Sequence, residues 1–167
     1  MLIRERTEAD FAPCIDLALA VKAQDDYPPR GPIDADWFLA PTEQLAAWVA
    51  EDESSVVGHV ALHSAADYAS TRLASTYLGC ALSSLGVIAR LFVAPGHRGS
   101  GVGQALLARA TASAVERGLQ PVLDVATNLD GAIHLYESVG WHRVGEVTLS
   151  VWDELPISLY VYIAATK

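Results

Sequence analysis

The sequence predicts a mixed α/β domain in which helices flank a sheet. Two observations predict this fold class. Apolar segments separated by turn residues indicate hairpins on both sides of the chain's middle. Between the hairpins, over about residues 86–127, a strand rich in β-branched residues precedes a helix and a second strand. Such a unit crosses over right-handed with its strands parallel, and the length of 167 residues favours one domain, 1–167.

The first third of the chain predicts a strand, a helix and a break. MLIRER alternates apolar and charged residues, which is typical of an edge strand. Thr7 is a suitable N-cap for a helix over about 8–24. The residues expected to face inward are Phe11, Cys14, Ile15, Ala18 and Leu19. Residues 25–37 hold three prolines and a glycine and interrupt regular structure, so we expect a short helix only after Pro41.

The remaining elements are predicted from periodicity and from turn residues. A helix over about 70–82 is expected within the alanine-rich segment 64–85. The helix of the central unit ends at Arg117 and Gly118, and a later short helix has Asp130 as its N-cap and Gly140 just after its end. The expected strands are 46–50, 55–63, 86–93, 121–127, 141–151 and 158–165.

Composition and charge indicate which kinds of binding partner the protein is expected to have. The net charge is −9, from 20 acidic and 11 basic residues, which argues against nucleic-acid binding. It is compatible with a cationic substrate, or simply with a solvated acidic surface. Cys14 and Cys80 form neither a disulfide framework nor a metal cluster and are expected to be reduced. We see no signal peptide or membrane span, so a cytoplasmic protein without a membrane partner is expected.

A glycine-rich stretch, RGSGVG, connects the central strand to its helix. The first amides of a helix lack intrahelical acceptors and carry a partial positive charge, which makes them an anion site. Glycine lets a phosphate approach the backbone closely. The stretch therefore predicts a pyrophosphate cradle, and the alternative is a tight strand-to-helix turn.

Two familiar phosphate loops do not fit this stretch. A Walker A loop requires Gly-Lys-Ser/Thr, whereas Gly103 is followed by Gln104. The dinucleotide fingerprint requires G-x-G-x-x-G, whereas Gly99, Gly101 and Gly103 give G-x-G-x-G.

Two motifs within residues 87–147 carry a family resemblance. The first is Val93-Ala94-Pro95 followed by residues 98–103, RGSGVG. The second is AIHLYESVGW, in which the matching residues are Ala132, Leu135, Tyr136, Glu137, Gly140 and Trp141. Together, in this order, they resemble the GCN5-related N-acetyltransferase (GNAT) superfamily. About 60 residues carry the specific match, and the flanks match in element order.

The resemblance implies a fold, a cosubstrate and a binding site. The fold is the GNAT-like acyl-CoA N-acyltransferase fold: a mostly antiparallel sheet with a central parallel, splayed strand pair. The cosubstrate is acetyl-CoA, whose acetyl group moves to an amine by direct attack in a ternary complex. The residues matching the pyrophosphate site and its neighbours are Arg98, Gly99, Ser100, Gly101, Val102, Gly103 and Gln104. Pantetheine would pair with the backbone of Leu91, Phe92 and Val93, and Asn128 is a further candidate contact.

The resemblance also implies how the reaction is assisted. A backbone amide near Leu91–Val93 would stabilise the oxyanion. Tyr136 would give a proton to the leaving thiolate, its alternative role being that of a core aromatic. The central strand lacks the glutamate that serves many relatives as general base, and Arg90 lies there among apolar residues. The remaining candidates for the base are His59, His63, Asp124 or a water relay.

The acceptor side is expected around residues 25–37. The carboxylates there, Asp25, Asp26, Asp34 and Asp36, are suited to attract a cationic amine. Tyr27 and Trp37 would offer ring faces, and the alternative is a solvated loop. The segment 64–85 is expected to form a wall of the acceptor pocket or a homodimer contact. A small-molecule amine is the expected acceptor, and the alternatives are a CoA-binding regulatory module and a protein or peptide N-acetyltransferase.

Overall fold

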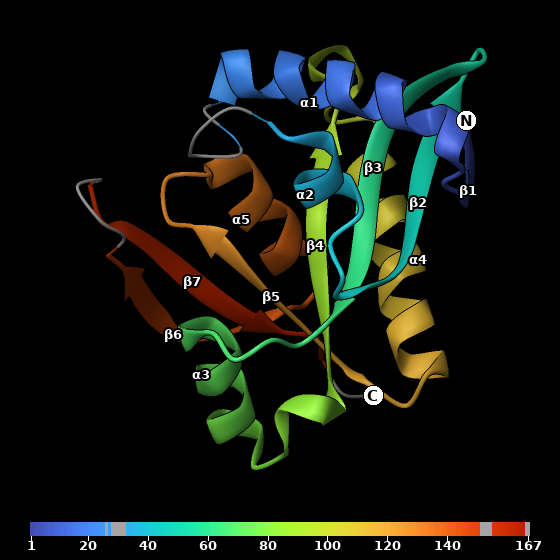
Figure 1. The fold of residues 1–167 in the computed structure, drawn as a ribbon. Coiled ribbons are helices and arrows are strands. Elements are labelled where there is room, and N and C mark those ends of the chain that lie inside the picture. The colour runs from blue at the N-terminus through green and yellow to red at the C-terminus, as the bar shows by residue number, and fades with distance from the viewer. Residues whose placement is uncertain (26, 28–32, 151–154, 166–167) are drawn as a thin grey trace. The chain divides into compact units, whose positions relative to one another are not determined.

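The computed structural model describes residues 1–25, 27, 33–150 and 155–165. Across these residues, seven strands form a sheet with the order β1-β2-β3-β4-β5-β7-β6 (Figure 1). The strands are β1 (Leu2–Glu5), β2 (Gln44–Asp52), β3 (Ser55–Ser64), β4 (Leu85–Val93), β5 (Gln120–Ala126), β6 (His142–Leu149) and β7 (Ile157–Ile163). The α-helices are α1 (Phe11–Asp25), α2 (Ala35–Leu39), α3 (Ala69–Leu78), α4 (Val102–Glu116) and α5 (Asp130–Ser138). Short 3₁₀ turns cover Glu8–Asp10, Leu82–Ser84 and Pro95–His97.

The predicted mixed sheet is confirmed. Strands β1 and β2, β2 and β3, β5 and β7, and β6 and β7 pair antiparallel. Strands β4 and β5 pair parallel, with Leu85–Val87 beside Gln120–Val122. Those three positions are the only paired ones between the two strands in the described part of the chain, although β4 continues to Val93. This early end of the pairing agrees with the splayed pair that the resemblance implies.

The chain divides into two compact units, both discontinuous in sequence. One comprises Met1–His63 and Ile88–Ser113, and the other comprises Ser64–Val87 and Ala114–Lys167. The organisation of 1–167 as one domain stays a prediction. Within the described ranges, no helix is long and apolar enough to cross a membrane.

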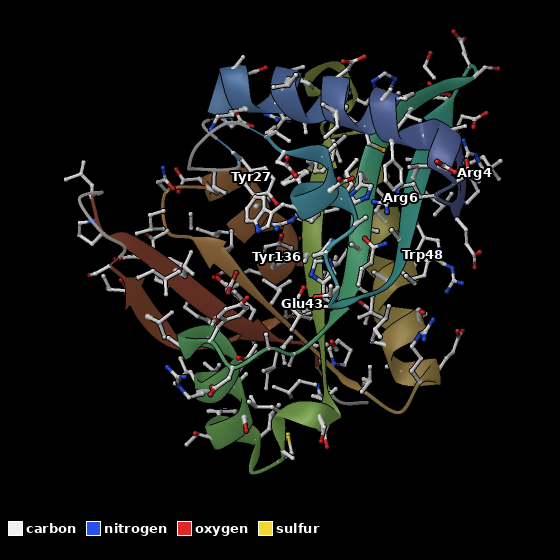
Figure 2. The ribbon with its side chains drawn as sticks, in the orientation of Figure 1. Arg4, Arg6, Tyr27, Glu43, Trp48 and Tyr136 are labelled. Atoms are coloured by element: carbon white, nitrogen blue, oxygen red, sulfur yellow. The ribbon has the colours of Figure 1, made fainter. Side chains whose placement is uncertain are left out.

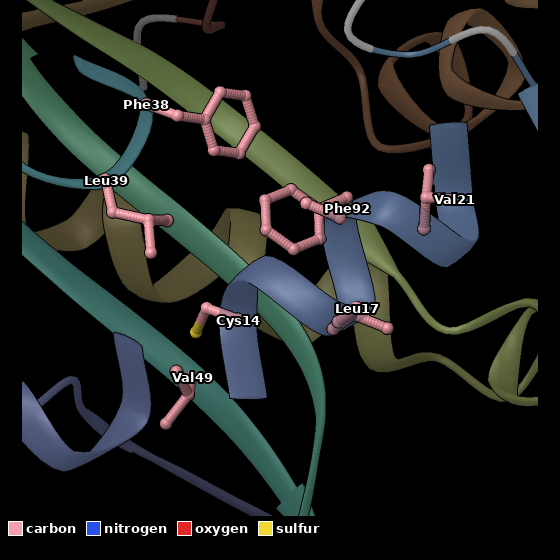
Figure 3. Close-up of a cluster of buried hydrophobic side chains, with 8 residues drawn as sticks. Cys14, Leu17, Val21, Phe38, Leu39, Val49 and Phe92 are labelled. Carbon is pink, nitrogen blue, oxygen red and sulfur yellow. The ribbon is translucent and has the colours of Figure 1, made fainter. Parts of the chain in front are cut away.

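In the first unit, α1 and α2 cover one face of the sheet. Their buried side chains meet those of β2 and β4 in the cluster of Cys14, Leu17, Ala18, Val21, Phe38, Leu39, Val49 and Phe92 (Figure 3). Helix α4 lies against the opposite face, because Trp48 points away from its neighbour Val49 and lies 5.0 Å from the Arg109 guanidinium. A Cβ on Gly58 would come within 2.8 Å of the Leu106 side chain of α4, so helix and strand touch closely here.

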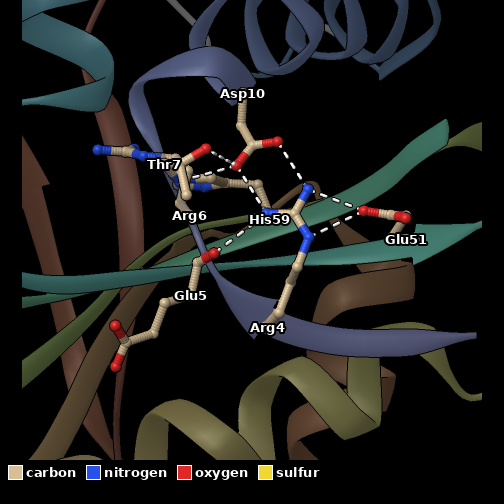
Figure 4. Close-up of polar contacts among 7 residues, drawn as sticks. All are labelled: Arg4, Glu5, Arg6, Thr7, Asp10, Glu51 and His59. Carbon is tan, nitrogen blue, oxygen red and sulfur yellow. Dashed lines mark hydrogen bonds and ion pairs between the residues drawn. The ribbon is translucent and has the colours of Figure 1, made fainter. Parts of the chain in front are cut away.

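A charge network joins β1 and β2 to the turn before α1 (Figure 4). Arg4 donates to both carboxylate oxygens of Asp10 at 2.8 Å and to Glu51 at 2.8 Å. The Thr7 N–H also donates to Asp10, at 2.7 Å, which fits the predicted N-cap. The Arg4 hydrogen bond lowers the pKa of the Asp10 carboxyl far below its usual value, and the same contacts raise the pKa of Arg4. We call Arg4, Thr7, Asp10 and Glu51 the Arg4 network.

In the second unit, α3 covers one face of the sheet and supplies part of its core. Its Ala74 packs in a buried cluster with Leu85, Val122, Val161 and Ile163. A Cβ on Gly145 of β6 would come within 2.8 Å of a Leu73 methyl group, so helix and strand touch closely. Helix α5 lies against the other face, because Tyr136 packs on Tyr162, the neighbour of Val161. Packing on the sheet thus accounts for the length of the segment 64–85, and its expected roles in a pocket or dimer stay predictions.

Three local predictions are wrong by small shifts. Leu19 is 49 % exposed, because the buried stripe of α1 runs through Leu17 and Val21 instead. The short helix expected after Pro41 is α2, which lies before that proline and is capped by the Asp34 side chain on Trp37 N–H at 2.9 Å. A residue before proline is disfavoured in helical conformation, so the helix ends early.

The third shift is at α5. Its N-cap is Leu129, and Asp130 is the first helical residue, where its charge still favours the helix N-terminus. Gly140 follows the helix with a φ of +85°, and Gly118 follows α4 with a φ of +73°, both as predicted.

Candidate functional site

The glycine stretch forms an exposed turn between β4 and α4. Gly99 and Gly101 have φ values of +75° and +87°, in the left-handed region that favours glycine. A Cβ at either position would meet no protein atom within 4 Å. Backbone conformation therefore requires glycine here, and the space that the missing Cβ leaves open is outside the protein.

The first turn of α4 presents backbone donors. Its first helical hydrogen bond runs from Ala105 N–H to the Gly101 carbonyl at 3.0 Å. The amides of residues 102–104 precede that bond and have no acceptor within the helix. The Val102 side chain is buried against the position of Gly58, so its backbone alone is available to a ligand. The turn thus has the backbone donors that an anion cradle requires, and its role as a cradle stays a prediction.

Side chains of the cradle are engaged within the fold. Arg98 forms an ion pair with Asp25 of α1. The Ser100 hydroxyl donates to the His97 carbonyl at 2.5 Å. An anion at this turn would therefore meet mainly backbone groups, and Arg98 must exchange Asp25 for a phosphate if it is to bind one.

Strand β4 is irregular at Arg90. This residue has a φ of +55°, a conformation that is rare for a long side chain. After it, Phe92 is buried, while Leu91 and Val93 are half-buried. The Arg90 carbonyl accepts a hydrogen bond from His59 Nδ1 of β3 at 2.8 Å. Hydrophobic periodicity alone does not predict this kink, although a charged residue inside an apolar strand marks its place.

His59 uses both of its ring nitrogens. Arg6 reaches from the end of β1 toward β3 (Figure 2), and its Nη1 lies 2.9 Å from His59 Nε2. A guanidinium only donates, so Nε2 accepts and the proton is on Nδ1. Burial lowers the pKa of His59 to about 3, and its ring stacks on Phe92 at 5.0 Å. His59 thus holds the kink of β4, and it has no free lone pair for a substrate proton.

His63, four residues further along β3, differs from His59. Burial, together with the charge of Arg90, lowers its pKa to about 4. Its Nε2 is buried and has no hydrogen-bond partner among the residues that the structure describes. The third candidate base, Asp124, is an exposed residue of β5 in the second unit. In the described ranges, no group of three or more His, Cys, Asp or Glu side chains is arranged to hold a metal ion.

The Arg90 side chain lies against α2. Its Nε donates to the Phe38 carbonyl at 3.2 Å. The guanidinium carbon lies 4.7 Å from the ring centroids of both Trp37 and Phe38. We call Arg90, Trp37, Phe38 and His59 the Arg90 cluster.

The residues predicted for the acceptor have mixed surroundings. Trp37 is 56 % exposed, and one ring contact is already made by the Arg90 cation. Tyr27 is half-buried against the core cluster of α1 and α2. Asp34 caps α2, Asp25 pairs with Arg98, and Asp26 lies outside the described residues.

Tyr136 and Asn128 belong to the second unit. Tyr136 is a buried residue of α5, with ring centroids 6.3 Å from Trp141 and 5.9 Å from Tyr162. Asn128 is exposed in the turn after β5. Their roles toward acetyl-CoA stay predictions.

The glutamate of the second motif has a structural role that the sequence did not reveal. Glu137 Oε1 accepts hydrogen bonds from the Tyr162 hydroxyl and from Arg143, both at 2.8 Å. The Arg143 guanidinium also lies 4.0 Å from the Tyr160 ring. These contacts tie α5 to β6 and β7, and the hydrogen bonds lower the pKa of Glu137.

Comparison with known proteins gives a consistent picture. The model of the acetyltransferase (GNAT) family matches residues 12–141. A search of the curated proteins found no match.

Solved structures share the fold at low sequence identity. A ribosomal-protein-alanine N-acetyltransferase from Brucella melitensis superposes with a TM-score of 0.74 at 21 % identity, covering 99 % of this chain and 100 % of that one. The Salmonella typhimurium protein yncA, solved with its cofactor acetyl-CoA, gives 0.72 at 20 % identity, covering 97 % and 91 %. Arabidopsis thaliana NAA60, in complex with a bisubstrate analogue, gives 0.74 at 16 % identity, covering 97 % and 95 %.

Proposed function

This chain belongs to the acetyltransferase (GNAT) family, and we propose that it transfers the acetyl group of acetyl-CoA to the amine of a small molecule. The observation that carries the proposal is the path from β4 into α4. A kinked strand with a left-handed Arg90 leads into a turn with left-handed Gly99 and Gly101 and a helix N-terminus with unbonded amides. The exposed backbone of the strand can bind an extended chain. The turn and the helix N-terminus together can bind a phosphate.

The amides of Val102, Gly103 and Gln104 would bind the pyrophosphate, with Gly99 and Gly101 leaving the approach open. Arg98 and Ser100 flank that approach. Pantetheine would lie along the backbone of Leu91–Val93, where the family resemblance puts it. Because the helix end is positive before any ligand arrives, it needs little reorganisation to accept the pyrophosphate.

In the reaction, the amine nitrogen bonds to the acetyl carbonyl carbon and the carbon–sulfur bond breaks. The amine loses a proton, and the departing thiolate gains one. A backbone amide after the Arg90 kink would stabilise the oxyanion, and a donor held rigidly before the reaction is the effective kind. The His59 hydrogen bond to the Arg90 carbonyl supports such rigidity. Tyr136 would protonate the thiolate.

Removal of the amine proton is assigned to His63 and water. The Nε2 atom of His63 has no hydrogen-bond partner among the described residues, whereas both ring nitrogens of His59 are engaged. A pKa of about 4 keeps His63 neutral near pH 7 but makes it a weak base, so the proton passes on to water.

A small acceptor is favoured by how closely α2 covers β4. Phe38 packs on Phe92 with ring centroids 5.8 Å apart, and Arg90 fills the space beside Trp37. An extended polypeptide would have to displace these contacts to reach β4 at this point. The name of the Brucella neighbour, a ribosomal-protein-alanine N-acetyltransferase, keeps a protein or peptide acceptor as the second candidate.

Release of free CoA thiol from acetyl-CoA tests the proposal. The assay compares polyamines, aminoglycosides, amino acids and short peptides as acceptors, with mass spectrometry of each product. Acetylation of a small amine supports the proposal, and acetylation confined to peptides favours the second candidate. CoA binding without transfer to any acceptor would instead indicate a regulatory CoA-binding module.

A further inference from the structure

Arg90 is held so that part of its hydrogen-bonding capacity is unused. Its Nε donates to the Phe38 carbonyl, and its guanidinium lies against the rings of Trp37 and Phe38. Among the residues that the structure describes, no carboxylate lies within ion-pairing distance of Arg90, and no side chain or carbonyl accepts from its two terminal nitrogens. The terminal nitrogens form a fixed, planar pair of donors.

The backbone of Arg90 is held as firmly as its side chain. A φ of +55° is unfavourable for an arginine and persists only where the surroundings enforce it. His59 enforces it through the bond to the Arg90 carbonyl, and Arg6 in turn holds His59. Backbone strain of this kind clusters at sites that bind ligands.

The chemistry of the free donors selects a planar anion. A guanidinium matches a carboxylate with two parallel hydrogen bonds, and these charge-assisted bonds are stronger than neutral ones. Arg90 is half-buried, so water competes less for it than for a surface arginine. The described carboxylates of residues 25–37 do not serve it: Asp25 pairs with Arg98, Asp34 caps α2, and Asp36 has no ion pair with Arg90.

We propose that Arg90 binds a carboxylate of the acetyl acceptor, which makes the acceptor an amino acid or a close analogue with its amine near that carboxylate. The inference rests on the proposed function, because it assumes that the amine is acetylated beside Leu91–Val93, the residues that follow Arg90. The transfer itself is unchanged: the carboxylate is bound and not transformed. A cationic amine without an anionic group would instead meet the like charge of Arg90.

Matched pairs of acceptors test the inference with the wild-type protein. Each amino acid of the panel is compared with its decarboxylated amine and with its neutral amide, at equal concentrations of the unprotonated amine. We expect kcat/KM to be roughly 10- to 100-fold higher for the amino acid, the range of a charge-assisted hydrogen-bonded pair. Wild-type transfer to amines and amides at the same rate as to amino acids would overturn the inference and leave the proposed function intact.

Variants locate the effect at Arg90. R90Q should raise KM for the amino acid by roughly 10- to 100-fold and should lower the preference for the amino acid over its decarboxylated amine by a similar factor. R90K keeps the charge but loses the paired donors, so an intermediate loss is expected. The matched control is R109Q, because Arg109 also lies over a tryptophan, but it belongs to α4 and its partner is Trp48 of β2. It should leave the preference for the amino acid unchanged.

The acetyl-CoA affinity and the melting temperature of each variant show whether a loss of activity comes from acceptor recognition or from a folding defect. An R90Q protein that binds acetyl-CoA normally yet keeps the full preference for amino acids would overturn the inference. If R90Q fails to fold, the matched pairs with wild-type protein decide alone. Transfer to peptide N-termini in preference to free amino acids also overturns the inference about Arg90. If no acceptor is acetylated, both that inference and the proposed function fail.

Discussion

Two arginines of the first unit show how differently the fold treats the same side chain. Arg4 makes hydrogen bonds to Asp10 and Glu51 at 2.8 Å and links β1, β2 and the start of α1. Arg90 lies against two rings and one carbonyl, without a carboxylate among the described residues. The Arg4 guanidinium is therefore fully engaged by carboxylates of the chain, whereas the terminal nitrogens of Arg90 have no acceptor among the described residues.

The same contrast appears between His59 and His63 and along α4. His59 has two partners and His63 has an unpartnered nitrogen. The amides at the start of α4 have no helical acceptor, whereas its end is closed by bonds to Gly118 and Leu119. Buried or clustered polar groups normally find partners, so the groups of the proposed site that have none are candidates for ligand contacts.

The largest effect is expected at the start of α4. Gly101→Glu adds a carboxylate next to the unbonded amides, so the affinity for CoA should fall roughly 100-fold or more through like-charge repulsion. Isothermal titration calorimetry measures it. The matched control is Gly118→Glu, which also replaces an open, left-handed glycine (φ +73°) but at the other end of α4. If both variants bind CoA equally, the cradle is not at the N-terminus of α4.

Tyr136→Phe should reduce kcat about 100-fold, the lower range for loss of a general acid, with CoA affinity within about 2-fold of wild type. Steady-state kinetics with the best acceptor measures it. Tyr77→Phe, on the exposed surface of α3, is the control. An unchanged kcat in Tyr136→Phe would mean that the residue is only a core aromatic beside Tyr162.

Arg4→Gln should affect stability and leave catalysis intact. It leaves the buried Asp10 carboxylate without its main partner, and we expect the free energy of unfolding to fall by about 2–3 kcal/mol. Urea denaturation measures it. The control is Arg72→Gln, whose ion pair with Asp67 is exposed and is worth at most about 0.5 kcal/mol. A marked fall in kcat/KM of the folded Arg4→Gln protein would remove the distinction between the Arg4 network and the Arg90 cluster.

The smallest expected effect is a pH dependence of stability. The pKa of His59 is lowered from 6.5 to about 3, so the unfolded chain binds a proton that the folded one excludes between these values. Stability is therefore full above about pH 6.5 and falls as the pH drops, by about 2 kcal/mol at pH 5 for His59 alone.

Urea denaturation at pH 7.5 and pH 5 tests this difference. His59→Gln should lose about 2 kcal/mol of the pH dependence, whereas the exposed His134→Gln should retain it. The Asp10 carboxyl does not interfere, because its lowered pKa changes stability only below about pH 4. An equal pH dependence in wild type and His59→Gln would contradict the assigned burial of a neutral His59.

The sequence predicted elements that depend on local signals. The path from β4 through the glycine turn to α4 was predictable because β-branched residues, Pro95 and the glycines are local determinants of strand, turn and helix start. The C-terminal glycines Gly118 and Gly140 were predictable for the same reason.

Features that depend on contacts distant in sequence were not predictable. The kink at Arg90 depends on His59, 31 residues earlier, and on the rings of α2. The partners of Glu137 come from β6 and β7, and the motif alone gave no sign of them. The position of α2 depends on the Asp34 cap, which the expectation of a helix after Pro41 leaves out of account.

A titration of the ¹⁵N-labelled protein with CoA, followed through the backbone amide signals, tests the central claim most directly. The account predicts the largest shifts at residues 91–93 and 99–104, whose backbone is proposed to bind pantetheine and pyrophosphate, with little change in the Arg4 network. Shifts that leave both of these segments unaffected while CoA binds would contradict it.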